Sequence, residues 1–395
     1  MDNNVLTMTK RRARVALLIQ YFLNGFIFSA LLSRMPSIRD YYDMSMAQLG
    51  LVLFFMSLGA LSTMPLCVYL MGKYGSKKMT VAGYGYMLLL PLLTMMSTID
   101  TLGVARHLLV YSLCAVYGVF VSMLDVAMNG NSIIVENAYR RPIISMFHAL
   151  YYVGVCFGAL LSVVFLTNHI SVQAHYLLVT CVSIPLFTII RKWYLKETIT
   201  VQKVASKKKI LFPQGALLML AFVALCSRVV EGSVNNWSTV YMKEVVRFAD
   251  NLAPLGLTMY AAFMSIGRFF CDIIRSKYKE TSILLSCCLL ASVGVFIIIL
   301  KDRILFAFLG LMLAGLGISC LVPIIYSLAG RQKEVTPAMG IAMVNTISGT
   351  GFLFGPFLIG LIADCFSMWA SFAYIWGLTI LMTLLALNYR RKTSI

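Results

Sequence analysis

A few ionisable and amide side chains lie inside long apolar stretches of this sequence, where lipid or packed helices should surround them. Asp125 falls within the apolar run 104–130, and Ser122, Asp125 and Asn129 share one helical face through their i, i+3, i+7 spacing. A carboxyl group shielded from water can hold a proton near neutral pH, whereas a neighbouring arginine favours its ionised form. The pattern therefore indicates proton exchange or solute hydrogen bonding at Asp125; the alternative is a fixed salt bridge between helices.

A second polar group lies in the apolar run 212–237. Arg228, Glu231 and Asn235 share a face, because they are three and four residues apart. Arg228 and Glu231 can neutralise each other locally, so the group is interpreted either as a contact for a solute or gate, or as a structural pair. Arg34 ends the first apolar run and can either reach the headgroups or turn inward to a carboxylate or an anionic solute.

Single polar residues in other apolar runs are weaker candidates. Gln20 and Asn24 share a face of the first run, and buried amides suit hydroxyl-rich ligands but also join helices. His148 can relay protons or can pack as a hydrogen-bonded side chain, and Asn345 occupies the corresponding position in the second half of the chain. Asn24, His148 and Asn345 are all kept as candidate binding residues.

Charged residues near the predicted cytoplasmic helix ends are candidates for gating. Arg268 and Asp272 lie one helical turn apart in the run 252–275, and we interpret them as a gate or a structural pair. No Cys-x2-Cys pair or Cys/His cluster points to a metal, and no cofactor is expected.

Twelve long apolar segments must position these residues. A bilayer core about 30 Å thick needs roughly 20 apolar residues per helical crossing. The sequence therefore predicts an all-α membrane protein with 12 transmembrane helices in two six-helix, pseudo-symmetric bundles, residues 1–190 and 212–395, joined by a basic cytoplasmic linker over 191–211. The predicted spans are 14–36, 46–71, 79–97, 104–130, 143–166, 172–190, 212–237, 252–275, 281–300, 303–328, 338–362 and 366–388.

The composition supports lipid as the solvent and gives the orientation. The chain is 60% hydrophobic and only 12% charged, about half the charged fraction of a typical soluble domain. Most of its 33 Lys and Arg fall in the two tails and the even-numbered loops, which the positive-inside rule places in the cytoplasm together with both termini. The net charge of +18 is therefore attributed to topology and to contact with anionic lipids, and a nucleic-acid partner is excluded.

The two halves repeat each other weakly. Gly154-x3-Gly158 in the fifth segment matches Gly351-x3-Gly355 in the eleventh. Pairs of glycines at this spacing allow two helices to approach closely within a membrane. Several such matches favour a parallel repeat about an axis normal to the membrane.

These features resemble the major facilitator superfamily over essentially the whole chain. Within it, the sequence is similar to the fucose-permease-like branch and to a set of poorly characterised bacterial inner-membrane carriers. The matching motifs are Arg34-Met35-Pro36-Ser37-Ile38-Arg39, Asp125-x3-Asn129, Glu231-Gly232-Ser233 with Asn236-Trp237, and Gly267-Arg268-Phe269.

The resemblance implies solute movement by alternating access, often driven by the proton gradient. In the fucose carriers a carboxylate of the fourth helix serves proton and sugar binding, and Asp125 occupies the similar position. Those carriers also use a first-helix carboxylate, where this chain has Leu32, so a relay of two carboxylates is in doubt. The loop motif Gly72-Lys73-Tyr74-Gly75-Ser76-Lys77-Lys78 keeps basic residues, Lys73 among them as a gating candidate, but has Gly72 where the family has Asp. The gate pairing of that Asp must be absent or replaced.

We therefore predict a secondary active transporter of a small polar solute, such as a sugar or sugar derivative, in the cell inner membrane. Its partners would be the solute, protons and membrane lipids, and it would act as a proton-coupled symporter and a monomer. The alternative is a proton-driven exporter of metabolites or drugs, which the absence of a proline after Gly158 disfavours. An enzyme is not expected, because none of the four histidines has an acid four to six residues away. A sensor or scaffold would need a soluble region larger than the longest loop.

Overall fold

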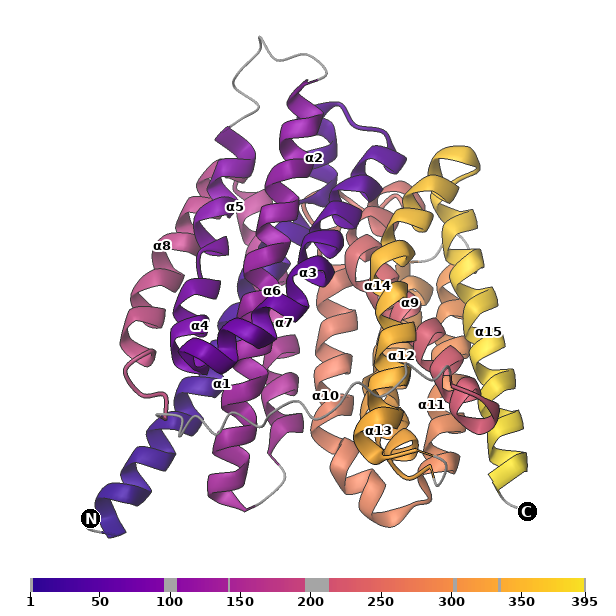
Figure 1. The fold of residues 1–395 in the computed structure, drawn as a ribbon. Coiled ribbons are helices and arrows are strands. Elements are labelled where there is room, and N and C mark those ends of the chain that lie inside the picture. Colours follow the sequence, from indigo (N-terminus) through magenta and orange to yellow (C-terminus); the bar gives the residue numbers. More distant parts are fainter. Residues whose placement is uncertain are drawn as a thin grey trace. The chain divides into compact units, whose positions relative to one another are not determined.

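The computed structural model describes residues 3–95, 105–140, 143–195, 213–300, 304–332 and 335–393. Every regular element among these residues is an α-helix (Figure 1). Eleven of the helical segments are long and apolar enough to cross a membrane. The prediction of an all-α membrane protein is thus confirmed.

The chain divides into two compact units, one of Met1–Asp43 with Leu51–Lys208 and one of Met44–Gly50 with Lys209–Ile395. The helices of the first are α1 (Asn3–Ser33), α2 (Met35–Tyr42), α3 (Met46–Tyr74, whose first turn is grouped with the second unit), α4 (Ser76–Gly83), α5 (Tyr86–Met95), α6 (Ala105–Tyr139), α7 (Ile144–Thr167) and α8 (Val172–Ile190). The helices of the second are α9 (Gly215–Glu244), α10 (Leu255–Lys277), α11 (Glu280–Ile299), α12 (Ile304–Ser319), α13 (Leu321–Gly330), α14 (Pro337–Cys365) and α15 (Met368–Thr393). The domain boundaries taken from the sequence stay a prediction, and much of the expected linker lies outside the described residues.

The third predicted segment, 79–97, is divided into α4 and α5, and its last two residues lie outside the described part of the chain. The division falls at Tyr84–Gly85, where the ring of Phe120 packs so closely that a Cβ on Gly85 would lie 2.8 Å from it. The Tyr84 ring in turn stacks on Phe187 of α8. A weak helix-forming residue and two aromatic contacts thus coincide with the division of this segment.

The tenth predicted segment, 303–328, is likewise divided, at Cys320 between α12 and α13. Pro323 has no N–H with which to continue the helical hydrogen bonds across this point. At the same point the Ser319 hydroxyl donates to the Leu316 carbonyl at 2.7 Å. The two pieces still form one membrane-length segment, Ile304–Gly330.

Glycines bring the first helix of each unit against a later helix of the same unit. In the first unit α1 packs along α7, where a Cβ on Gly154 would lie 2.9 Å from the Phe22 carbonyl carbon. In the second unit α9 packs along α14, where a Cβ on Gly351 would lie 3.0 Å from the Leu225 carbonyl oxygen. The two matching Gly-x3-Gly motifs thus serve the same packing role in each half, as a repeat requires.

Candidate functional site

In the first unit, a chain of hydrogen bonds joins α5, α1 and α6 at Asp125. The Tyr86 hydroxyl donates to the Asn24 side-chain oxygen at 3.1 Å, and the Asn24 amide nitrogen donates to the Asp125 carboxyl at 3.2 Å. Tyr86 is fully buried and Asn24 is 5% exposed, whereas Asp125 is half-buried. Because both ends of the Asn24 amide are engaged, its donor nitrogen is held toward Asp125.

Asn129 and His148 join this network through Tyr21 of α1. The Tyr21 hydroxyl donates to the Asn129 side-chain oxygen at 3.0 Å, and the Asn129 amide donates to the Asp125 backbone carbonyl at 2.9 Å. The ring of Tyr21 also meets His148 edge to face, with centroids 5.1 Å apart. The structure therefore brings together four of the predicted residues, Asn24, Asp125, Asn129 and His148, from three helices.

Asp125 has a neutral amide as its side-chain partner. Within the described part of its own unit, no lysine or arginine forms an ion pair with it, so the predicted alternative of a fixed salt bridge finds no partner there. The Asn24 amide can donate to either a carboxylate or a protonated carboxyl group. The hydrogen bond from Asn24 is therefore compatible with either charge state of Asp125.

The second unit holds a compact charged cluster built around Glu231 of α9. Glu231 lies 3.3 Å from the Arg268 guanidinium of α10 and 3.5 Å from that of Arg228. The Glu231 side chain is only 6% exposed, that of Arg268 is 12% exposed and that of Arg228 is 22% exposed. One carboxylate therefore holds two arginines, and Arg228 is the more accessible of the two.

Arg228 also links this charged cluster to α13 and α14. It donates to the Tyr326 hydroxyl at 3.5 Å, and Tyr326 donates to the Asn345 side-chain oxygen at 2.6 Å. The central carbon of the Arg228 guanidinium lies over the Phe352 ring, 4.9 Å from its centroid. Asn345 thus belongs to the cluster, whereas Asn235 is buried one turn beyond Glu231 and its side-chain oxygen has no hydrogen-bond partner among the described residues.

Arg268 and Asp272, which we expected to form a gate or a structural pair, each take part in an ion pair with another residue. Arg268 turns to Glu231 on α9, and Asp272 lies 3.7 Å from Arg275. Arg275 in turn binds Glu280 at the start of α11, at 2.7 Å. The physical reason is that a carboxylate on a neighbouring helix, nearly enclosed by protein, competes better for Arg268 than a half-exposed one on the same helix surface.

Arg34 turns inward, and it donates to two uncharged groups. It is 3% exposed, its Nε donates to His175 Nδ1 at 3.2 Å, and its terminal nitrogen donates to the Ile170 carbonyl at 2.9 Å. It therefore ties the α1–α2 corner to the start of α8, and His175 is a partner that the sequence offered no spacing signal to find.

The α3–α4 turn, which carries the gating candidate Lys73, is held by uncharged groups. The ammonium of Lys73 lies 5.3 Å from the ring centroid of Tyr74. The Ser76 hydroxyl donates to the Asn131 side-chain oxygen at 2.9 Å, and the Asn131 amide donates to the Thr80 hydroxyl at 3.1 Å. Asn131 of α6 thus anchors the turn, in a loop motif that has Gly72 where the family has Asp. The gating role of Lys73 stays a prediction.

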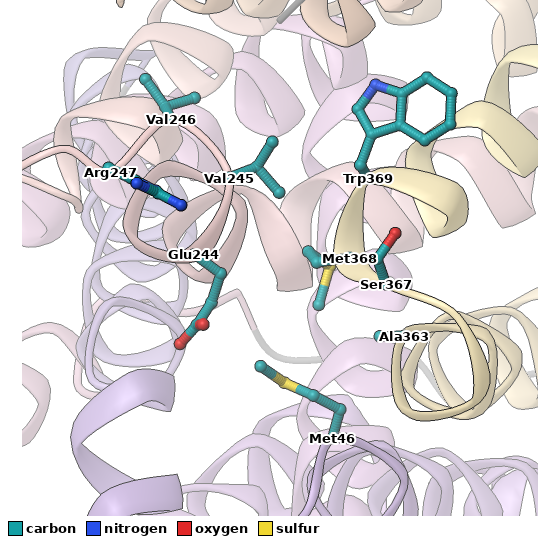
Figure 2. A pocket seen from close by; sticks show the side chains of 9 residues that line it. All are labelled: Met46, Glu244, Val245, Val246, Arg247, Ala363, Ser367, Met368 and Trp369. Atoms are coloured by element: carbon teal, nitrogen blue, oxygen red, sulfur yellow. The ribbon is translucent and has the colours of Figure 1, made fainter. Parts of the chain in front are cut away.

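A separate pocket of about 660 Å³ lies in the second unit, where the end of α9 meets the start of α15 (Figure 2). Its lining includes Glu244, Arg247 and Trp369, together with Met46 from the segment grouped with this unit. None of the predicted binding or gating residues lines it. The charged cluster around Glu231 and the network around Asp125 remain the candidate sites.

Comparison with known proteins agrees with this architecture. The sequence profile of the Major Facilitator Superfamily matches residues 17–334. An uncharacterized MFS-type transporter of Yersinia pestis is 29% identical over 360 residues, covering 91% of each chain, and the membrane protein MosC of Rhizobium meliloti is 24% identical over 390 residues, covering 98% of this chain and 92% of MosC. Among solved structures, the nucleoside transporter NupG superposes with a TM-score of 0.72 at 11% identity, over 95% of this chain and 98% of NupG. A bacterial homolog of the human lysosomal transporter Spinster gives a TM-score of 0.69 at 13% identity, over 95% of this chain and 96% of the homolog.

Proposed function

This chain belongs to the Major Facilitator Superfamily, and from that premise we propose that it couples movement of a small polar solute to movement of protons. The family consists of multi-pass membrane transporters, so secondary transport of a small solute is the general activity. The proposal adds the coupling ion, the polar character of the solute, and the residues that bind the proton and the solute.

The observation that carries the proposal is the setting of Asp125. A carboxyl group inside a membrane helix is costly unless it faces a polar environment, is paired or has a function. Asp125 is held by a neutral amide that is itself fixed by Tyr86, and this arrangement supports loading and release of a proton at its carboxyl group.

The charged cluster around Glu231 supplies the second part of the proposal. Guanidinium, phenol and amide groups converge there from α9, α10, α13 and α14, and Phe352 offers an aromatic face. Binding sites for small polar molecules combine a few such polar groups with apolar walls. We assign solute recognition to Arg228, Tyr326 and Asn345, and support of Arg228 to Glu231 and Arg268.

Import into the cell across the inner membrane is the direction we propose, by a monomer with both termini in the cytoplasm. The basic loops support this orientation. The helix α7 reads Gly158-Ala159 without the proline that family exporters often carry at this place, which supports import.

A screen for solute-driven proton uptake tests the proposal. Right-side-out vesicles containing the protein are given single sugars, sugar acids, nucleosides or amino acids without a pre-set gradient, and external pH is recorded. A symporter makes the outside more alkaline with its own solute, and vesicles from a deletion strain do not. Transport of a radiolabelled solute with no pH change, unaffected by a protonophore, would reject proton coupling.

A further inference from the structure

We infer that enclosed water molecules bind along a row of three side chains in the first unit, Tyr117 of α6 with His175 and Tyr176 of α8, and that they carry protons to Asp125. We call these three residues the polar seam. The binding of water depends only on unpaired polar groups of the seam, whereas its role in proton transfer rests on the proposed function.

Each member of the polar seam has a buried polar group without a hydrogen-bond partner. The hydroxyls of Tyr117 and Tyr176 and the Nε2 atom of His175 are unpaired among the described residues, and the three residues are at most 1% exposed. Because His175 Nδ1 accepts from Arg34, the neutral ring carries its hydrogen on Nε2, so this atom is a donor. Leaving three such groups unpaired is costly, and native proteins satisfy them with other protein groups or with bound water.

The polar seam connects α8 to α6. Tyr176 follows His175 directly, and the centroids of their rings lie 5.8 Å apart. Tyr176 also interacts electrostatically with Tyr117 and with Cys114, which lies three residues earlier on α6. Water is the smallest molecule that both donates and accepts, so it can link the histidine N–H to the two hydroxyls in turn.

One end of the seam reaches the hydrogen bonds that hold Asp125. The ring of Tyr117 meets that of Tyr86 edge to face, with centroids 5.2 Å apart. Tyr86 and Tyr117 both interact electrostatically with Asp125. Tyr86 is also joined to the Asp125 carboxyl group through Asn24. A water molecule bound at the Tyr117 hydroxyl therefore lies close to the network that positions Asp125.

The other end of the seam lies at Arg34, near helix ends that the predicted orientation places outside the cell. Arg34 donates to His175 and to the carbonyl of half-buried Ile170. It directly follows α1 and is ten residues from Asn24, about 15 Å along the helix axis. Positive Arg34 and ionised Asp125 thus lie toward opposite ends of the seam, and their field drives a proton toward Asp125.

A proton would cross the seam by exchange between neighbouring oxygens. Each water molecule or hydroxyl accepts one proton and releases another, and the Asp125 carboxylate takes the last one, so no group is oxidised or reduced. Phenols suit this role because each can both donate and accept. The inference thereby gives a use to three buried residues that no sequence pattern singled out.

Radiolytic footprinting tests for the bound water without a solute or a proton gradient. A brief X-ray pulse converts water in place to hydroxyl radicals, so a buried tyrosine beside bound water is oxidised. Mass spectrometry of peptides from the full-length protein gives the rate at each tyrosine, and heavy-oxygen water shows how fast the neighbouring water exchanges. The dry control is Tyr241, which is 1% exposed and donates to the Ile298 carbonyl at 2.9 Å. The open control is Tyr278, which is 66% exposed.

We expect Tyr117 and Tyr176 to be oxidised faster than Tyr241 and to take up heavy oxygen more slowly than Tyr278. Oxidation of either tyrosine no faster than that of Tyr241 would show a dry seam and overturn the inference. Uptake of heavy oxygen as fast as at Tyr278 would show contact with bulk water, which would overturn it as well.

A laser-triggered pH jump on the purified protein tests the proton path, with infrared absorption of the Asp125 carboxyl group as the readout. Asp125→Asn identifies the band. Tyr117→Phe removes only the hydroxyl, and we expect protonation of Asp125 to slow by about tenfold, the rate effect of one lost hydrogen bond. Tyr194→Phe is the matched control, because its hydroxyl is also buried and unpaired among the described residues but is not part of the seam. Tyr176→Phe takes the place of Tyr117→Phe if that variant does not fold.

An unchanged rate in the seam variant, or equal slowing in Tyr194→Phe, would overturn the proton path. A band of Asp125 that does not respond to pH would reject the proposed proton coupling and the path with it. Footprinting decides the water site separately in either case, because it involves neither Asp125 nor a proton gradient.

Discussion

Replacing Gly154 with alanine tests the packing that positions α1, and with it Asn24, against the rest of the first unit. A Cβ on Gly154 would lie 2.9 Å from the Phe22 carbonyl carbon and 2.9 Å from the Phe26 amide nitrogen, and closer still to the Phe22 oxygen. Non-bonded carbon atoms in contact are about 3.5–4.0 Å apart. Because all of these neighbours are backbone atoms, no change of rotamer can relieve the contact, and α1 and α7 must separate by at least about half an ångström.

The expected cost follows from two opposing terms. Overpacking of a well-packed core costs about 1–3 kcal/mol, and the better helix propensity of alanine returns up to about 1 kcal/mol. We expect a net loss of about 1–2 kcal/mol, which corresponds to a fall of roughly 2–8 °C in the midpoint of thermal unfolding of the detergent-purified protein. Gly377→Ala is the matched control, because a Cβ there meets nothing within 4 Å. The reasoning fails if Gly154→Ala is as stable as wild type, or if Gly377→Ala is the less stable of the two.

Three further substitutions test other contacts by the same thermal assay. Arg268→Gln removes one of the two arginines that pair with nearly enclosed Glu231 and should cost about 3 kcal/mol, and adding Glu231→Gln should restore part of that loss; equal stability of the single variant and wild type would contradict the buried pair. Gly75→Ala forces a side chain onto a backbone with φ 82° and ψ 155° and should cost about 1–3 kcal/mol, an effect absent in an ordinary helical glycine. Trp237→Phe removes the bond to the Pro356 carbonyl and should cost about 1 kcal/mol; no loss would show that this bond contributes nothing.

Among the described residues, eleven of the twelve predicted spans form membrane-length helical segments, and they could be predicted from the sequence because the thickness of the bilayer fixes the length of an apolar helix. The breaks within two of the predicted spans could not be placed as easily. At Gly85 the side chain packed against the break is that of Phe120, which is 35 residues away and reaches it only in the folded unit. At Cys320 the cause, Pro323, was visible in the sequence, but proline also occurs inside helices that stay continuous, such as α14.

The site shows the same division between local and tertiary information. The shared face of Asp125 and Asn129 follows from helical spacing alone, and the bond between them is within one turn. The partner of Arg268 does not follow from spacing. Spacing favoured Asp272, whereas the structure pairs Arg268 with Glu231, 37 residues away on another helix. Single residues such as Asn131 and His175 have no periodic pattern, so only the packed helices identify their roles.

The most direct test of the account is the effect of Asp125→Asn on two kinds of transport in proteoliposomes. The asparagine keeps an oxygen to accept from Asn24 but cannot be ionised, so the fold and the solute site should persist while proton exchange is lost. With a solute identified by the vesicle screen, we predict that the variant still exchanges solute by counterflow but no longer accumulates it against its gradient when a proton gradient is imposed. Asp43→Asn, an exposed position whose left-handed backbone suits asparagine, should behave as wild type in both assays. Accumulation by Asp125→Asn with the proton dependence of the wild type would contradict the account.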